Sequence, residues 1–153
     1  MSEQEGYRHK VQYYETDQMG IVHHSNYIRW FEEARIDYME RLGMSYARME
    51  EEGILSPVLS VSAEYLRMIH FGDVAQIRCR IREYNGIKLT LSYEVVSEKT
   101  GMIHCKGSSG HCFLSREGKP LSLKRSAPEF HERFQKGLNE SETGGREEEK
   151  NIF

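Results

Sequence analysis

One segment of the chain, from Ser25 to Leu42, restricts the possible folds more than any other. It contains neither proline nor glycine, and its apolar residues recur at spacings of three and four. This period predicts a helix that packs by one broad face. Ser25 or Asn26 can cap its start by accepting a hydrogen bond from a free backbone N–H, and Gly43 suits its end. The apolar stripe consists of Tyr27, Phe31, Ala34, Tyr38 and Leu42.

Most of the remaining chain alternates between apolar and polar residues, which predicts strands. The clearest case runs from Ala75 to Arg82, where every second residue is apolar. Asn85 and Gly86 follow as a hairpin turn, because both residue types tolerate a positive φ. A shorter helix is expected over residues 45–52, ended by Gly53. The predicted strands cover residues 7–14, 59–65, 75–82, 89–95 and 102–114.

The length of 153 residues suits one domain. We assign residues 1–136 to a single domain that ends in a helix over 127–136. Residues 137–153 are polar and acidic, so we expect a mobile tail. The apolar share of 38% and the charged share of 29% predict a modest core, which association with further copies would enlarge.

Charge and hydropathy exclude several classes of protein. A formal net charge of -3 argues against a protein built around nonspecific nucleic-acid binding. No stretch approaches the length of a membrane-spanning helix, and the N-terminus lacks the apolar core of a signal peptide. The three cysteines form no CxxC pair, which favours reduced thiols. These features predict a cytosolic protein.

A motif between the first strand and the long helix consists of Val11, Tyr13, Tyr14, Glu15, Thr16, Asp17, Gly20, Ile21, Val22, His24, Asn26 and Tyr27. This motif resembles the signature of the 4-hydroxybenzoyl-CoA thioesterase family. That resemblance implies an α+β hotdog fold, in which a curved antiparallel sheet wraps around a long central helix. It also implies acyl-CoA substrates, no metal or other cofactor, and a homodimer or homotetramer. Glu15 and His23 depart from the family pattern, in which aspartate and tyrosine are common.

The resemblance implies that Asp17 is the catalytic residue. Its carboxylate can attack the thioester carbonyl directly or act as a general base for water, and the sequence leaves both routes open. Free N–H groups at the helix start can stabilise the oxyanion that develops on the carbonyl oxygen. We therefore predict that the protein hydrolyses an acyl-CoA thioester to a carboxylic acid and CoA, with Asp17 as nucleophile or general base. The predicted substrate-binding residues are His24, Ser25, Asn26 and Tyr27.

Simpler interpretations stand beside these predictions. An isolated aspartate in a loop usually forms a turn, and the adjacent His23 and His24 lack the spacing of a metal site. Glu33 is a secondary catalytic candidate. The alternative functions are a hotdog dehydratase or hydratase and a noncatalytic module that binds acyl thioesters, and a carrier-protein thioester is an alternative substrate. Basic residues that could meet CoA phosphates, or simply form a solvated face, are Arg78, Arg80, Arg82, Lys88 and Arg116.

Overall fold

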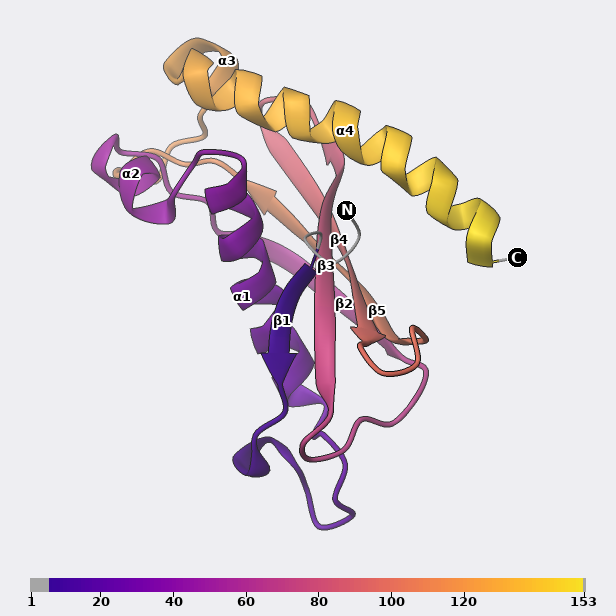
Figure 1. Ribbon diagram of the computed structural model, residues 1–153. Helices are drawn as coiled ribbons and strands as arrows, with labels where there is room; N and C mark the ends of the chain where they lie inside the picture. The colour runs from indigo at the N-terminus through magenta and orange to yellow at the C-terminus, as the bar shows by residue number, and fades with distance from the viewer. Residues whose placement is uncertain (1–5, 153) are drawn as a thin grey trace. The chain divides into compact units, whose positions relative to one another are not determined.

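The computed structural model describes residues 6–152, and the side chains of residues 6–141. Its strands form one five-stranded sheet in the order β1-β3-β4-β5-β2 (Figure 1). The prediction of an α+β fold with an antiparallel sheet is confirmed. The elements are β1 (Gly6–Lys10), the 3-10 helix η2 (Tyr13–Glu15), α1 (Ser25–Arg41), α2 (Tyr46–Glu51), β2 (Val58–Tyr65), β3 (Val74–Tyr84), β4 (Lys88–Ser97), β5 (Ile103–Cys112), α3 (Leu123–Ser126) and α4 (Pro128–Ile152).

The two helices predicted in the first third of the chain are present. Helix α1 is followed by Gly43, whose φ of 89° is the left-handed conformation that favours glycine. Helix α2 is capped by Ser45, whose hydroxyl accepts from the Arg48 amide. The first strand is shorter than predicted and ends at Lys10. It ends there because Gln12 donates its amide to the Glu15 carboxylate, which closes the chain into η2.

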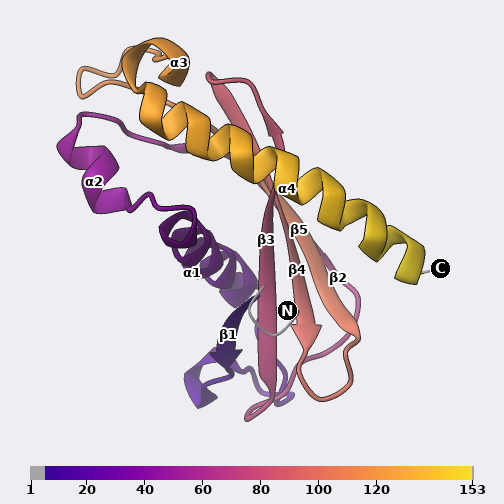
Figure 2. The same ribbon diagram turned by 45° about the horizontal axis from the view of Figure 1, so that its top comes forward.

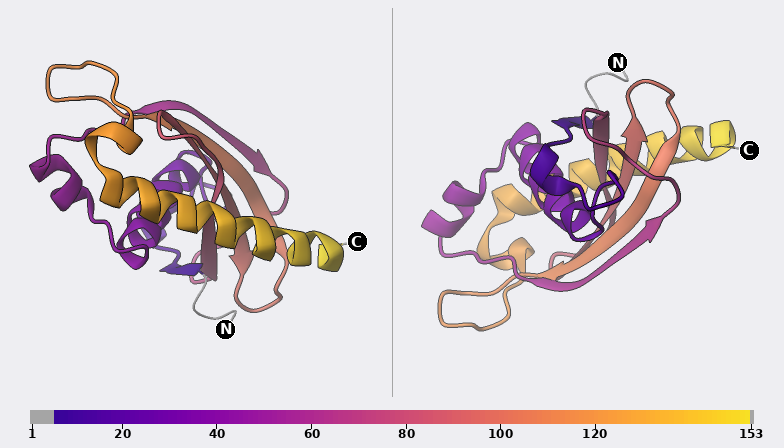
Figure 3. Two further views of the ribbon diagram at one scale, coloured as in Figure 1. Left: turned by 90° about the horizontal axis from the view of Figure 1, so that it is seen from above. Right: turned by 90° about the horizontal axis from the view of Figure 1, so that it is seen from below.

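Contacts within the chain divide it into two compact units, and strands β2 to β5 contribute residues to both. The first unit comprises residues up to 38, 61–79 and 92–108. Within it, β1 pairs antiparallel with β3, so that Tyr7 lies opposite Ile77. Helix α1 lies against the strands of this unit (Figure 3). The Phe31 ring of α1 stacks on Tyr93 of β4, with centroids 4.4 Å apart.

The second unit comprises residues 39–60, 80–91 and the chain from 109 onward. Helix α4 passes over strands of this unit (Figure 2). It buries Phe134, whose ring centroid lies 5.2 Å from Tyr84 of β3 and 5.6 Å from Phe113. The predicted turn is confirmed at Gly86, with a φ of 90°, and the Asn85 carboxamide oxygen accepts from the Lys88 amide.

The C-terminal helix is longer than predicted. We expected a helix over 127–136 and a tail over 137–153, yet the backbone of α4 is helical to Ile152. Glutamate, lysine and arginine are good helix formers, so a polar composition is compatible with the longer helix. The mobility of residues 137–153 and the single domain over 1–136 stay predictions. None of the helices within residues 6–152 is both long and apolar enough to cross a membrane.

Candidate active site

Asp17 begins a tight turn in the loop between η2 and α1. The Asp17 amide donates to the Ile21 carbonyl over 2.9 Å, and the Gly20 amide donates back to the Asp17 carbonyl over 3.0 Å. Gly20 has a φ of 77°, which a residue with a side chain rarely adopts. Thr16 and Val22 pair beside this turn, so residues 16–22 form a small hairpin, here called the Asp17 hairpin.

The Asp17 carboxylate is partly buried and held by its own turn. Its Oδ1 accepts the Met19 amide over 2.8 Å, which is the hydrogen bond of an Asx turn. Within the described residues, Oδ2 has no hydrogen-bond partner. Asp17 therefore does form the turn that is usual for an aspartate in a loop. This turn uses only Oδ1 and leaves Oδ2 free to act on a substrate or a water molecule.

Asp17 lines a cavity of about 410 Å³ in the first unit. One wall is the Asp17 hairpin with the start of α1, and the other is the end of β2 with the loop that follows it. Backbone hydrogen bonds join these two walls, since the Val22 amide donates to the Ile69 carbonyl over 2.7 Å and Ile21 pairs with His70. The lining residues are Asp17, Met19, Ile21, Val22, His24, Tyr27, Tyr65, Leu66, Arg67 and Met68.

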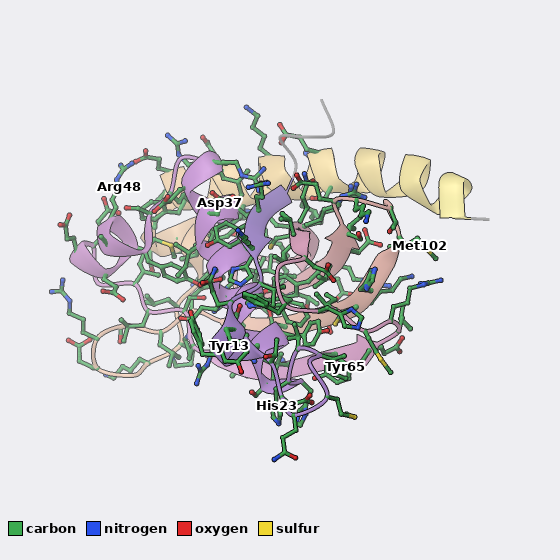
Figure 4. All side chains as sticks on the ribbon, turned by 60° about the horizontal axis from the view of Figure 1, so that its bottom comes forward. Tyr13, His23, Asp37, Arg48, Tyr65 and Met102 are labelled. Carbon is green, nitrogen blue, oxygen red and sulfur yellow. The ribbon has the colours of Figure 1, made fainter. Side chains whose placement is uncertain are left out.

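The rings of His24, Tyr27 and Tyr65 lie together in the cavity that Asp17 lines. The Tyr65 hydroxyl donates to the His24 carbonyl over 3.3 Å, and the Tyr27 and Tyr65 ring centroids are 5.1 Å apart. His23 and Tyr65 are found at the same end of the unit (Figure 4). Burial raises the pKa of both Tyr27 and Tyr65 above the ordinary value, so both hydroxyls stay protonated near neutral pH. The tyrosines therefore offer O–H donors and apolar ring faces.

The helix-start amides have weak or local partners. The Ser25 amide lies 3.3 Å from His23 Nδ1, the Asn26 amide donates to the His23 carbonyl over 3.0 Å, and the Tyr27 amide donates to the His24 carbonyl over 3.3 Å. The two 3.3 Å contacts are longer than an ordinary N–H hydrogen bond. Of these three residues, only Tyr27 lines the cavity.

The capping role predicted for Ser25 or Asn26 is wrong. The Asn26 carboxamide nitrogen donates to the Glu15 and His23 carbonyls, and the Ser25 hydroxyl pairs with His23 Nδ1. Because the helix already begins at Ser25, both side chains are turned toward the preceding loop instead of the free amides.

The structure brings together Asp17, His24 and Tyr27, but the described cavity lining includes neither Ser25 nor Asn26. Substrate binding by all four of the predicted binding residues stays a prediction. The sequence reasoning missed Tyr65, Arg67 and Met68 as cavity residues. Tyr65 is the last residue of β2, and Arg67 and Met68 follow it, about forty residues from the motif, so only the folded chain brings these segments together.

Other candidates are also placed. Glu33, the secondary catalytic candidate, is not among the residues that line the cavity, and its Oε2 lies 3.6 Å from His9 Nδ1, so the proposed reaction does not use it. In the second unit, Arg116 donates to the Glu50 and Glu51 carbonyls at the end of α2. Burial raises the pKa of the Cys105 thiol to about 12, which suppresses its nucleophilic thiolate form. Among the described residues, no group of three His, Cys, Asp or Glu side chains is arranged to hold a metal ion. The absence of a cofactor stays a prediction.

Comparison with known proteins agrees with this geometry. Residues 11–138 match the family model of the thioesterase-like superfamily. YneP of Bacillus subtilis is 36% identical over 128 residues, which cover 83% of this chain and 92% of YneP. The structure of a DHNA-CoA thioesterase from Staphylococcus aureus superposes with a TM-score of 0.83 at 34% identity, covering 91% of this chain and 93% of that one. YbgC of Escherichia coli, named an acyl-CoA thioester hydrolase, is 23% identical over 117 residues, 76% of this chain and 87% of YbgC.

The chain belongs to the thioesterase-like superfamily. The predictions of a hotdog fold and of a thioester hydrolase are thereby confirmed.

Proposed function

We propose that the protein hydrolyses an acyl-CoA thioester to a carboxylic acid and free CoA, with Asp17 as the catalytic residue. The observation that carries this proposal is the Asp17 carboxylate at the wall of the cavity, with Oδ1 fixed by the Met19 amide and Oδ2 without a partner among the described residues. The names of YbgC and of the staphylococcal enzyme support CoA as the thiol.

Two routes fit this carboxylate. In the first, Oδ2 attacks the carbonyl carbon, the C–S bond breaks, the thiolate of CoA leaves, and water then hydrolyses the mixed anhydride. In the second, Oδ2 removes a proton from water as the water oxygen attacks the same carbon, and CoA leaves from the tetrahedral intermediate. Both routes require an ionised Asp17 and a donor for the carbonyl oxygen.

We propose that the Tyr27 amide is that donor. It lies at the positive end of α1, and Tyr27 lines the cavity with Asp17. Its 3.3 Å contact with the His24 carbonyl is long, so a substrate oxygen can share the N–H without displacing a strong hydrogen bond. His24 and Ser25 complete the proposed substrate contacts, whereas the buried Asn26 side chain donates to the Glu15 carbonyl instead of facing the cavity.

The acyl group that best suits the cavity is a flat aromatic one. The rings of Tyr27 and Tyr65 and the thioethers of Met19 and Met68 line it, and both groups pack well against aromatic faces. DHNA-CoA, the substrate in the name of the staphylococcal enzyme, is therefore the first compound to assay.

The test is CoA release, followed with a thiol-detecting dye. The panel contains DHNA-CoA, benzoyl-CoA, straight-chain acyl-CoAs and one acyl-carrier-protein thioester. Asp17→Asn is expected to lower kcat by about 10²- to 10⁴-fold. The Asn side chain can still accept the Met19 amide, so the turn should persist. Full activity of Asp17→Asn would refute the mechanism. No release from any thioester by the unaltered protein would favour the noncatalytic binding module. An enoyl-CoA is assayed separately by its loss of ultraviolet absorbance, because hydration releases no thiol, and its hydration would favour the hydratase.

We also propose that the protein assembles as a homodimer or homotetramer in the cytosol. Strand β2 is an outer strand of the sheet and carries exposed apolar side chains, including Val58, Leu59 and Val61. An unpaired edge of this kind pairs readily with another strand, and a second copy would bury it. Light scattering tests this directly, and a monomer at micromolar concentration would count against it.

A further inference from the structure

Behind the Asp17 hairpin lies a buried carboxylate that the proposed reaction does not use. The Glu15 side chain accepts three hydrogen bonds, from the Gln12 amide over 2.8 Å, from His9 Nε2 over 2.8 Å and from Trp30 Nε1 over 2.6 Å. The residue is 4% exposed. Because an ionised carboxylate can only accept, His9 carries its proton on Nε2 in this arrangement. A buried charge is costly even when it is paired, so its presence calls for a reason.

The hydrogen bonds of the Glu15 main chain suggest why this residue is fixed so firmly. Its carbonyl accepts the His23 amide over 2.9 Å and the Asn26 carboxamide over 2.8 Å. The same Asn26 nitrogen lies 3.2 Å from the His23 carbonyl, and Asn26 is 7% exposed. Both ends of the Asp17 hairpin are thus joined to the first turn of α1, and Glu15 is fixed from its side chain as well as from its carbonyl.

We propose that Glu15 and Asn26 are positioning residues that hold the Asp17 hairpin at a fixed place relative to the start of α1. This inference rests on the proposed function of Asp17. The side chain of Glu15 is anchored to His9 of β1 and Trp30 of α1, while its carbonyl and Asn26 tie the two ends of the hairpin. Asp17 follows Glu15 by two residues, so a shift at residue 15 moves the carboxylate relative to the Tyr27 amide.

The cluster also continues toward the protein surface. His9 Nδ1 lies 3.6 Å from Glu33 Oε2, and the Glu33 side chain is 46% exposed. The His9 ring packs on Trp30, with centroids 4.7 Å apart. Glu33 therefore contacts His9 without a described hydrogen bond to the hairpin. Glu33→Gln is a matched control that alters the cluster from its outer side.

The test separates kcat from KM in four variants, using the thioester that the unaltered protein hydrolyses fastest. Glu15→Ala and Asn26→Ala are each expected to lower kcat by roughly 10- to 100-fold, because displacements of about 1 Å have effects of that size, while KM changes less than about twofold. Glu15→Gln retains an acceptor for Trp30 and should recover most of kcat. Glu33→Gln should leave both constants unchanged.

Two further measurements keep the outcome interpretable. Trp30 is the single tryptophan, so its fluorescence reports whether the cluster stays buried in each variant. In the Asp17→Asn background, Asn26→Ala should cause no additional loss, because the two changes act on one carboxylate.

If Glu15→Ala does not fold, the kcat of Asn26→Ala still tests the positioning role. A folded Asn26→Ala protein with unaltered kcat would overturn it, as would a rise in KM alone, which would indicate direct substrate binding. An inactive Asp17→Asn protein beside a fully active Asn26→Ala protein would reject the positioning role and leave the proposed function intact. Full activity of Asp17→Asn would reject the proposed function itself.

Discussion

Trp30 donates its indole N–H to Glu15 Oε2 over 2.6 Å, and both residues are buried. They are fifteen positions apart in the chain. The bond joins the interior of α1 to the end of η2, immediately before the Asp17 hairpin. An indole that must donate and a carboxylate that must accept satisfy each other here, which is the usual condition for burying either group.

This cluster predicts acid sensitivity. Burial alone would raise the pKa of Glu15, but hydrogen bonds from the Gln12 amide, His9 and Trp30 hold that pKa below its ordinary value. Its contribution to stability is therefore complete above the unfolded-state pKa of about 4.3 and is lost as pH falls through the lower folded-state pKa. We expect the free energy of unfolding to fall between about pH 5 and pH 3, and to fall less steeply in Glu15→Gln.

Urea unfolding followed by circular dichroism at a series of pH values measures both slopes. Glu33→Gln is the control, because Glu33 contacts the same His9 from an exposed position. Equal slopes for the unaltered protein and Glu15→Gln would show that another carboxylate causes the acid sensitivity.

The sequence predicted regular elements well where one period governs a long segment. Tyr27, Phe31 and Ala34 of the predicted stripe are buried, and so are the apolar residues that alternate from Ala75 to Ile81; neither prediction needed tertiary information. Tyr38 and Leu42 of the same stripe are only partly buried, and Leu42 lies beyond the end of α1. The prediction of the first strand failed, because a side chain changes the direction of the backbone there. Glu15 accepts the Gln12 amide and ends the first strand early, and no period records that bond.

The candidate site was predictable only in part, for a related reason. Asp17, His24 and Tyr27 belong to one continuous motif, so a local pattern could locate them. Tyr65 and Arg67 join them through pairing between distant segments, such as Ile21 with His70. The donor role of Asn26 toward the Glu15 carbonyl also depends on how the loop folds back.

Tyr65 provides a test of the cavity wall. Its hydroxyl makes a long, exposed hydrogen bond of 3.3 Å to the His24 carbonyl, whereas its ring lies 5.1 Å from Tyr27. Tyr65→Phe keeps the ring and should change kcat/KM by less than about threefold, since an exposed hydrogen bond contributes little. Tyr65→Ala removes an aromatic wall worth about 1 kcal/mol and should raise KM about fivefold. Steady-state kinetics with an aromatic acyl-CoA would reject this account if the Phe variant had the larger effect.

Arg67 is the cationic residue among those that line the cavity, and it is positioned by its bond from Nη1 to the Ile103 carbonyl over 2.8 Å. We expect it to attract the phosphates of CoA. Arg67→Ala should raise KM for an acyl-CoA roughly tenfold, equivalent to about 1.4 kcal/mol. Arg67→Lys should recover part of that loss, because it keeps the charge. The KM for an acyl-N-acetylcysteamine, which lacks phosphates, should not change; an equal rise for both substrates would indicate a distorted cavity instead.

Gly107 of β5 tests the packing of α1 in the first unit. A Cβ at this position would clash with the Phe31 ring and lie 2.7 Å from the Ser62 carbonyl oxygen, so the ring would have to move. The Phe31 ring stacks on Tyr93 and has little freedom to shift. Gly107→Ala should therefore lower the free energy of unfolding by about 1–3 kcal/mol.

Denaturant unfolding measures the change, with Ser108→Ala as the control on the same strand. That variant loses only an exposed hydroxyl contact with Ser62, so its stability should stay within about 0.5 kcal/mol. Equal stability of the two variants would show that Phe31 can yield, and that α1 is less tightly held on β5 than the described contacts imply.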